Sequence, residues 1–252
     1  MKTIKNLIAF FCCFFLTGLV LAFSQSKDLS TQENKFVKQF STLSNGAGDS
    51  EKFKKDFSAF LSANPNTIDF PFNKLKSNSF YITTSTDGNF RHYGWDTGQG
   101  GSMRFFNEVY QWRVGEKVFV KQVQGSEEGD SGEFSSKIYS INIQNKDYYL
   151  VITNSIFSNR DARQSVIAFF INNNQLVQAP IFKTKTKLLS RIDVDFDFFS
   201  VVDRPERPIE LITFNSKQDT LSIPVVDKDG KVTKRNILYV FNGTVLEFRG
   251  IK

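Results

Sequence analysis

The feature that most constrains this chain is the pattern that runs from Asp69 to the C-terminus. Short runs rich in Val, Ile, Phe and Tyr alternate with short motifs that favour tight turns. These turn signals lie at Asp87-Gly88, Gly115-Glu116, Asn145-Lys146, Asn172 to Asn174, Asp229-Gly230 and Asn242-Gly243. The pattern predicts a mainly β fold, an antiparallel meander of about twelve strands that forms a propeller-like stack, a sandwich or a wide barrel.

A different periodicity precedes the strands. Ser30 and Glu33 have the spacing of a capping box, and apolar residues follow them at helical intervals. After a break rich in Gly and Ser, a second helical run begins near Ser50 and ends before Pro65. We therefore expect a linker and a short N-terminal αα-hairpin over residues 25–68, and the antiparallel β domain over residues 69–252.

The first residues have the form of a secretory signal peptide. Lys2 and Lys5 precede an apolar run that ends at Phe23, after which the chain turns polar. The triplet Ala22-Phe23-Ser24 offers a cleavage site, so we expect residues 1–24 to be removed; an uncleaved membrane anchor is the alternative. The expected location is the periplasm, the cell surface or the extracellular medium, with no transmembrane span after cleavage.

Cleavage there would also remove both cysteines of the chain, Cys12 and Cys13. A cysteine-free remainder excludes thiolate metal sites and cysteine nucleophiles, and the single histidine, His92, excludes a His-rich zinc site within one chain. The formal charge of +6 is spread without a long Lys/Arg block, which argues against nucleic acid as a partner. We predict no metal site and no cofactor.

The most distinctive stretch runs from Thr86 to Phe106 and places His92 among closely spaced aromatic residues. Along the strand expected there, alternation brings Arg91, Tyr93 and Trp95 to one face. Such a row suits carbohydrate or peptide binding when it is exposed, and it is ordinary sheet packing with a cation–π contact when it is buried. The candidate ligand-binding residues are Arg91, Tyr93, Trp95, Asp96, Arg104 and Trp112.

These patterns favour an exported, non-enzymatic binding or interaction module for a carbohydrate, cell-wall or protein ligand. We assign no catalytic residue, because a Ser-His-Asp arrangement would have to use His92 and no serine has a G-x-S-x-G setting. One alternative is a carboxylate-dependent hydrolase acting on glycans, with Asp96 and Glu108 in a pocket that separates their pKa values. Another is a structural domain of a cell-envelope assembly, which would expose a large apolar patch.

Alternating charges predict one particular hairpin. Three lysines before a turn and three aspartates after it would form ion pairs on one solvated face, with the opposite face in the core. A metal-binding row of aspartates is the alternative. The expected pairs are Lys187 with Asp193, Lys185 with Asp195 and Lys183 with Asp197. The acidic stretch from Gln124 to Glu133 is expected to be a solvated loop, or one that holds a cation or guards an entrance.

Two motifs carry a resemblance. The stretch S-x-D-G-x-F-R-x-Y-x-W-D-T-G-x-G-G-S-M from Ser85 to Met103, with the closing Y-V-F-N-G-T-V-L-E-F, resembles a pattern in uncharacterised exported proteins of Bacteroidetes-type bacteria. The resemblance implies a periplasmic or secreted setting and no particular activity. The turn at Asp87 also resembles the Asp-box of sialidases, but Trp95 lies too far from Asp87 to match it.

Overall fold

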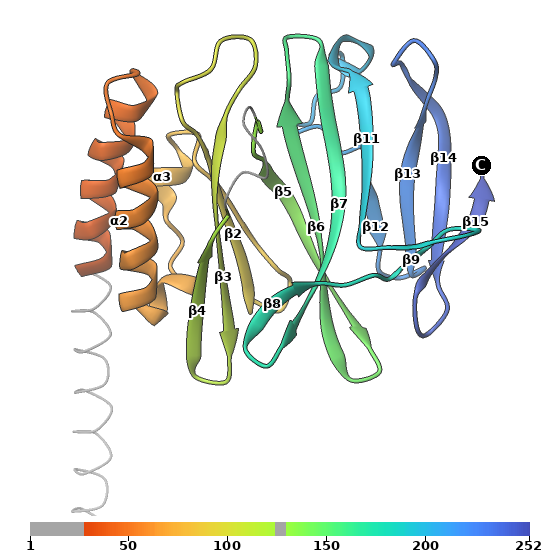
Figure 1. The fold of residues 1–252 in the computed structure, drawn as a ribbon, viewed down its shortest axis with the longest axis horizontal. Coiled ribbons are helices and arrows are strands. Elements are labelled where there is room, and N and C mark those ends of the chain that lie inside the picture. The colour runs from red at the N-terminus through yellow and green to blue at the C-terminus, as the bar shows by residue number, and fades with distance from the viewer. Residues whose placement is uncertain (1–27, 124–129) are drawn as a thin grey trace, which may run out of the picture.

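The computed structural model describes residues 28–123 and 130–252, and this part of the chain forms a layer of helices and three β-sheets (Figure 1). The expected signal peptide, its cleavage site and both cysteines lie outside the described residues. The prediction of a mainly β chain with antiparallel-rich sheets and few helices is confirmed. The count of about twelve strands was imprecise, and neither a propeller nor a barrel is confirmed. Within the described ranges, no helix is long and apolar enough to cross a membrane.

The helices lie where the apolar spacing predicts them. Residues 28–44 are helical, and α2 (Ser50–Ala63) follows with Asp49 as its N-cap, whose side chain accepts a hydrogen bond from the Lys52 N–H. Three short elements complete the helical structure: the 3₁₀ helix η1 (Pro65–Ile68), α3 (Asn73–Lys76) and the 3₁₀ helix η2 (Phe198–Val201).

The capping box expected at Ser30 and Glu33 was wrong, because the chain is already helical before Ser30. Glu33 is instead buried, and its side chain caps another helix. Its Oε1 accepts hydrogen bonds from the backbone N–H groups of Lys74 at 2.8 Å and Leu75 at 3.1 Å, at the start of α3. A carboxylate there satisfies donors that have no partner inside the helix.

The strands form three sheets, which are named A, B and C here. Sheet A has the order β1 (Tyr81–Thr84), β2 (Phe90–Asp96), β3 (Phe106–Val114), β4 (Lys117–Gln122). Sheet B has the order β11 (Arg191–Asp197), β7 (Asp161–Asn172), β6 (Lys146–Ile156), β5 (Phe134–Ile143), and β8 (Gln175–Gln178) also pairs with β7. Sheet C has the order β10 (Leu188–Leu189), β9 (Phe182–Lys183), β15 (Leu246–Ile251), β14 (Val232–Phe241), β13 (Thr220–Val226), β12 (Thr213–Asn215).

The turn signals lie between paired strands. Gln144 and Asn145 both have positive φ, 51° and 62°, between β5 and β6. Asn173 and Asn174 do the same, with φ of 47° and 66°, between β7 and β8. Two left-handed residues in sequence match the right-handed twist of the strands that they connect, which explains why asparagine is frequent here.

The predicted lysine–aspartate ladder was wrong. β9 and β10 belong to sheet C, whereas β11 crosses to sheet B and pairs with β7. The aspartates therefore contact arginines and a serine, of which all but Arg191 lie outside β11. The contacts are Asp193 with Arg191 and Ser165, Asp195 with Arg163, and Asp197 with Arg160. The opposite face was predicted correctly, since Val194 and Phe196 are buried.

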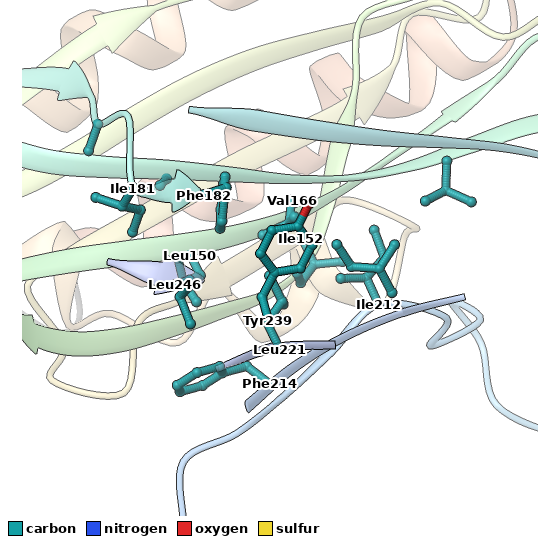
Figure 2. Packing of buried hydrophobic residues seen from close by; sticks show 14 of the residues in the cluster. Leu150, Ile152, Val166, Ile181, Phe182, Ile212, Phe214, Leu221, Tyr239 and Leu246 are labelled. Carbon is teal, nitrogen blue, oxygen red and sulfur yellow. The ribbon is translucent and has the colours of Figure 1, made fainter. Parts of the chain in front are cut away.

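The four layers stack side by side, helices, sheet A, sheet B and sheet C, and each interface has its own apolar core (Figure 1). Aromatic rings dominate the helix–sheet A core, where Phe53 meets Trp95 at 5.2 Å and Phe57 meets Tyr93 at 5.3 Å between ring centroids. Between sheets B and C the core is mainly aliphatic; Figure 2 shows Leu150, Ile152 and Val166 of sheet B beside Leu221, Tyr239 and Leu246 of sheet C. Sheet B is thus covered on both faces.

Candidate functional site

The row Arg91, Tyr93 and Trp95 lies in the core between β2 and the helices, so it is not an exposed contact surface. The Arg91 guanidinium donates hydrogen bonds to the Thr84 hydroxyl at 2.7 Å and to the Phe70 carbonyl at 2.6 Å. It also lies 5.8 Å from the Tyr93 ring centroid, a cation–π contact. The row is therefore ordinary sheet packing with a cation–π contact. It is buried because the helical hairpin covers this face of sheet A.

Tyr93 is held by a buried hydrogen-bonded row that crosses the same interface. Its hydroxyl donates to Gln111 Oε1 at 2.7 Å, and Gln111 Nε2 donates to the Thr67 hydroxyl at 2.8 Å. Burial raises the pKa of Tyr93 to about 12. The row therefore fixes η1 onto sheet A and offers no group to a ligand.

The other three candidate residues are separate from this row. Trp112 is buried between sheets A and B, and its Nε1 donates to the Asn174 carbonyl at 3.1 Å. Asp96 and Arg104 contact each other at 3.4 Å at the end of the β2–β3 hairpin, and the Asp96 carboxylate also accepts from the Gly98 N–H. The structure does not bring the six candidates together into one surface.

A cleft of about 1300 Å³ lies where α2, sheet A and sheet B meet. The two sheets approach each other most closely where β1, β2 and β3 lie beside β5, and the cleft opens on the other side, between β4 and the strands β7, β8 and β11. Its lining mixes aromatic rings, including Phe106 and Phe169, with many hydrogen-bonding groups. We call it the A–B cleft.

Gly94 allows the close approach that shapes one side of the cleft. A Cβ at this position would lie 3.0 Å from the Phe134 Cβ and 3.3 Å from the Glu133 carbonyl oxygen. Gly94 also pairs with Glu108 across β2 and β3. The absence of a side chain therefore lets the start of β5 come down onto β2, beside Glu108.

Glu108 is the most buried acid of the cleft lining. Its Oε2 lies 3.0 Å from His92 Nε2, and its Oε1 accepts a 2.8 Å hydrogen bond from the Glu133 N–H. On the far side of the imidazole, Nδ1 lies 2.7 Å from the Ser135 hydroxyl oxygen. Burial raises the pKa of Glu108, partly offset by His92, and the charge of Glu133 raises it further.

This Ser135–His92–Glu108 row has the residue types of a catalytic triad but not the access. Ser135 is 2% exposed, and neither Ser135 nor His92 lines the A–B cleft. A substrate in the cleft can reach only the glutamate. The row therefore orients the Glu108 carboxyl from behind, and it does not present a nucleophile.

Arg191 links the same region to sheet B. Its guanidinium forms two hydrogen bonds with the Glu133 carboxylate, one with Asp193 at 2.5 Å and one with the Ser165 hydroxyl at 2.8 Å. Burial lowers the pKa of Arg191, but hydrogen bonds and attraction from Glu133 and Asp193 outweigh it, and the pKa is raised. Arg191 is thus a fixed cation between two carboxylates.

Tyr110 completes the cluster. The side chain lines the cleft and is 6% exposed, and its hydroxyl has no hydrogen-bond partner among the described residues, yet it is not sealed inside the protein. Burial and the charges of Glu108 and Glu133 hold its pKa well above the usual value. We call Glu108, Tyr110, Glu133 and Arg191 the polar subsite of the cleft.

Sequence reasoning named one member of this subsite, Glu108, and paired it with Asp96. Asp96 does not line the cleft, whereas Glu133 and Arg191 do. Glu133 ends the acidic stretch that was expected to be a solvated loop; its residues 124–129 lie outside the described chain. The one local signal was Gly132-Glu133 immediately before a strand, which is too weak to indicate a site.

No protein family matches the chain, and no curated protein is similar to it in sequence. The site's defining features are a large cleft between two sheets, two linked glutamates in different environments, and a tyrosine of the lining whose hydroxyl has no partner among the described residues.

Proposed function

We propose that the protein is an exported β-rich binding module that holds a polar ligand of the carbohydrate or cell-wall class in the A–B cleft. Export is supported by the basic start, the apolar run and the small-residue triplet at residues 22–24. Binding is supported by the lining, which combines ring faces with carboxylate, amide and hydroxyl groups. Saccharides present apolar ring faces and many hydroxyls, so such a lining complements them.

The observation that carries this proposal is the Tyr110 hydroxyl. This hydroxyl has no hydrogen-bond partner among the described residues, and it is not one of the sealed core atoms without a partner, which are Trp95 Nε1, Ser140 Oγ and Thr153 Oγ1. In the cleft this hydroxyl is available to donate to or accept from a ligand. Its ring is fixed by Phe169 and Phe90, with centroids at 5.4 and 5.5 Å, so little ordering accompanies binding.

A thermal-shift panel of the purified protein with oligosaccharides and cell-wall fragments tests the proposal. We expect at least one compound to raise the melting temperature by several degrees, because binding to the native state alone adds about 2.7 kcal/mol at a hundredfold excess over Kd. Tyr110→Phe should reduce the shift. The matched control is Tyr239→Phe, a buried tyrosine of sheet C outside the cleft lining.

Two results would contradict the proposal. One is a wild-type protein whose melting temperature no compound changes. The other is an equal loss of the shift in Tyr110→Phe and Tyr239→Phe, which would place the ligand elsewhere.

The second candidate function is a glycan hydrolase in which Glu108 supplies a proton. One observation favours it. The buried Glu108 carboxyl has a raised pKa, and it accepts a hydrogen bond from the backbone N–H of Glu133, whose charge raises that pKa further. Such an enzyme would release reducing ends from a glycan that binds the cleft. Glu108→Gln should then abolish turnover while binding remains, and turnover at the wild-type rate in Glu108→Gln would exclude this role.

A further inference from the structure

The polar subsite carries more negative than positive charge. Three carboxyl groups lie in or beside it, those of Glu108, Glu133 and Asp193, and Arg191 supplies one guanidinium, which pairs with Glu133 and Asp193. Arg191 donates to the carboxylates of Glu133 and Asp193 and to the Ser165 hydroxyl, and it does not reach Glu108 by any hydrogen bond in the described chain. His92 contributes a charge only when it is protonated. An ionised Glu108 is therefore the carboxylate of this group that lacks a permanent cationic partner.

The surroundings of Glu108 in the cleft also favour a cation. Tyr110 lies beside it, and no residue that the structure describes is hydrogen-bonded to its hydroxyl; a phenol oxygen accepts hydrogen bonds as well as donating them. The faces of Tyr110 and Phe169, both of which line the cleft, carry the negative potential that attracts cations. The remaining cations of the lining are mostly engaged, Arg163 with Asp195 and Lys54 with Glu51.

We propose that the polar subsite recognises a positively charged amine, so that the ligand is an amine-bearing saccharide. The ammonium group would donate to the Glu108 carboxylate and the Tyr110 hydroxyl, against the aromatic faces. This inference rests on the proposed function and adds the charge of the group that the cleft selects. An uncharged or N-acylated sugar would leave Glu108 without a cationic partner.

A proton competes with the ammonium group for Glu108. The charged and titratable groups around this carboxyl are His92 from β2, Tyr110 from β3, Glu133 before β5, and Arg191 with Asp193 from β11. Because the carboxyl binds either a proton or the amine, affinity for the amine falls as the pH is lowered through the Glu108 titration. At mildly acidic pH, where the amine is itself fully protonated, binding releases a proton from the protein.

The test compares two tetrasaccharides that differ only in acylation, a glucosamine tetramer and its N-acetylated counterpart, by isothermal titration calorimetry with the whole protein. At neutral pH and low salt we expect the free-amine tetramer to bind about tenfold more tightly, the usual gain from a charge-assisted hydrogen bond. Glu108→Gln should remove that preference and leave the acetylated tetramer's affinity nearly unchanged. Asp96→Asn, outside the cleft, is the matched control and should keep the preference.

The wild-type protein alone provides an independent readout, should Glu108→Gln fail to fold. Titrations at mildly acidic pH in two buffers of different ionisation heat should show proton release with the free-amine tetramer and none with the acetylated one. Equal affinity for both tetramers, or a preference that persists in a folded Glu108→Gln, would overturn the inference while the proposed cleft function stands. A protein that binds neither tetramer, nor any compound of the thermal-shift panel, would overturn both.

Discussion

Glu108 is a carboxyl whose surroundings differ strongly from those of an exposed one. It is buried, it contacts His92, and it accepts a backbone hydrogen bond from Glu133. Burying a carboxylate is costly unless hydrogen bonds and charges compensate, so groups of this kind concentrate where a protein uses them. The same chain keeps Asp96 partly exposed in an ordinary ion pair with Arg104.

The pKa of Glu108 makes stability depend on pH in a defined direction. Between the unfolded value of 4.5 and the raised folded value, the folded state holds a proton that the unfolded state has released. The free energy of unfolding therefore falls as the pH rises through that window, by about 1.4 kcal/mol for each unit of difference. Glu108→Gln should flatten this part of the pH profile, measured by urea unfolding, and Glu116→Gln, in an exposed turn, should not. An unchanged slope in Glu108→Gln would refute the assignment.

At the scale of the elements, α2 is joined to sheet A by aromatic rings. Phe57 is fully buried, and its ring centroid lies 5.1 Å from that of Phe36 on the preceding helix and 5.3 Å from that of Tyr93 on β2. Both pairs meet edge to face, the arrangement that ring quadrupoles favour. One helical residue thus connects both helices to the sheet.

Phe57→Ala should lower the free energy of unfolding by about 3–5 kcal/mol, because it leaves a cavity in a core that cannot collapse around it. Phe199→Ala, at a phenylalanine that is 59% exposed, should change it by less than about 0.5 kcal/mol. Chemical denaturation of both variants measures the difference. Similar small losses in the two variants would mean that the helical hairpin contributes little to the stability of the fold.

At the scale of the whole molecule, the relative placement of sheets A and B decides the shape of the cleft. The two sheets come together at β2 and β5 through Gly94, where no side chain intervenes, and separate toward β4 and β11. The polar subsite draws residues from both sheets, so a small change in their spacing would separate Glu108 from Glu133. The geometry of the cleft therefore depends directly on how sheets A and B pack against each other.

Gly94→Ala is expected to destabilise the protein by about 1–3 kcal/mol, as overpacking of a tight interface usually does. It should also weaken ligand binding in the A–B cleft, because the start of β5 must move away from β2. Gly101→Ala is the control, since a Cβ there meets nothing within 4 Å. Urea unfolding and calorimetry check both effects, and a Gly94→Ala variant as stable as Gly101→Ala would show that the contact is not tight in solution.

Strand alternation could be predicted from the sequence, whereas the packing partner of each strand face could not, as single residues illustrate. The alternation in β2 correctly separated Arg91 and Tyr93 from His92, because side chains of a strand alternate between faces. Whether this face of β2 contacts solvent or the helices depends on the tertiary structure and not on the local sequence. The lysine–aspartate ladder failed for the same reason, since Asp193 pairs across sheet B with Ser165, 28 residues earlier.

The sequence by itself determined the two longer helices, the β-rich character of the remaining chain and the turns between neighbouring strands, because helix and turn signals act over a few residues. Only the tertiary structure decided how the sheets stack, that the aromatic row is buried, and that Glu108, Tyr110, Glu133 and Arg191 share a cleft. Arg191 and Glu133 are 58 positions apart in the chain. Contacts of that kind depend on how whole layers pack, and no periodicity or spacing within one segment records them.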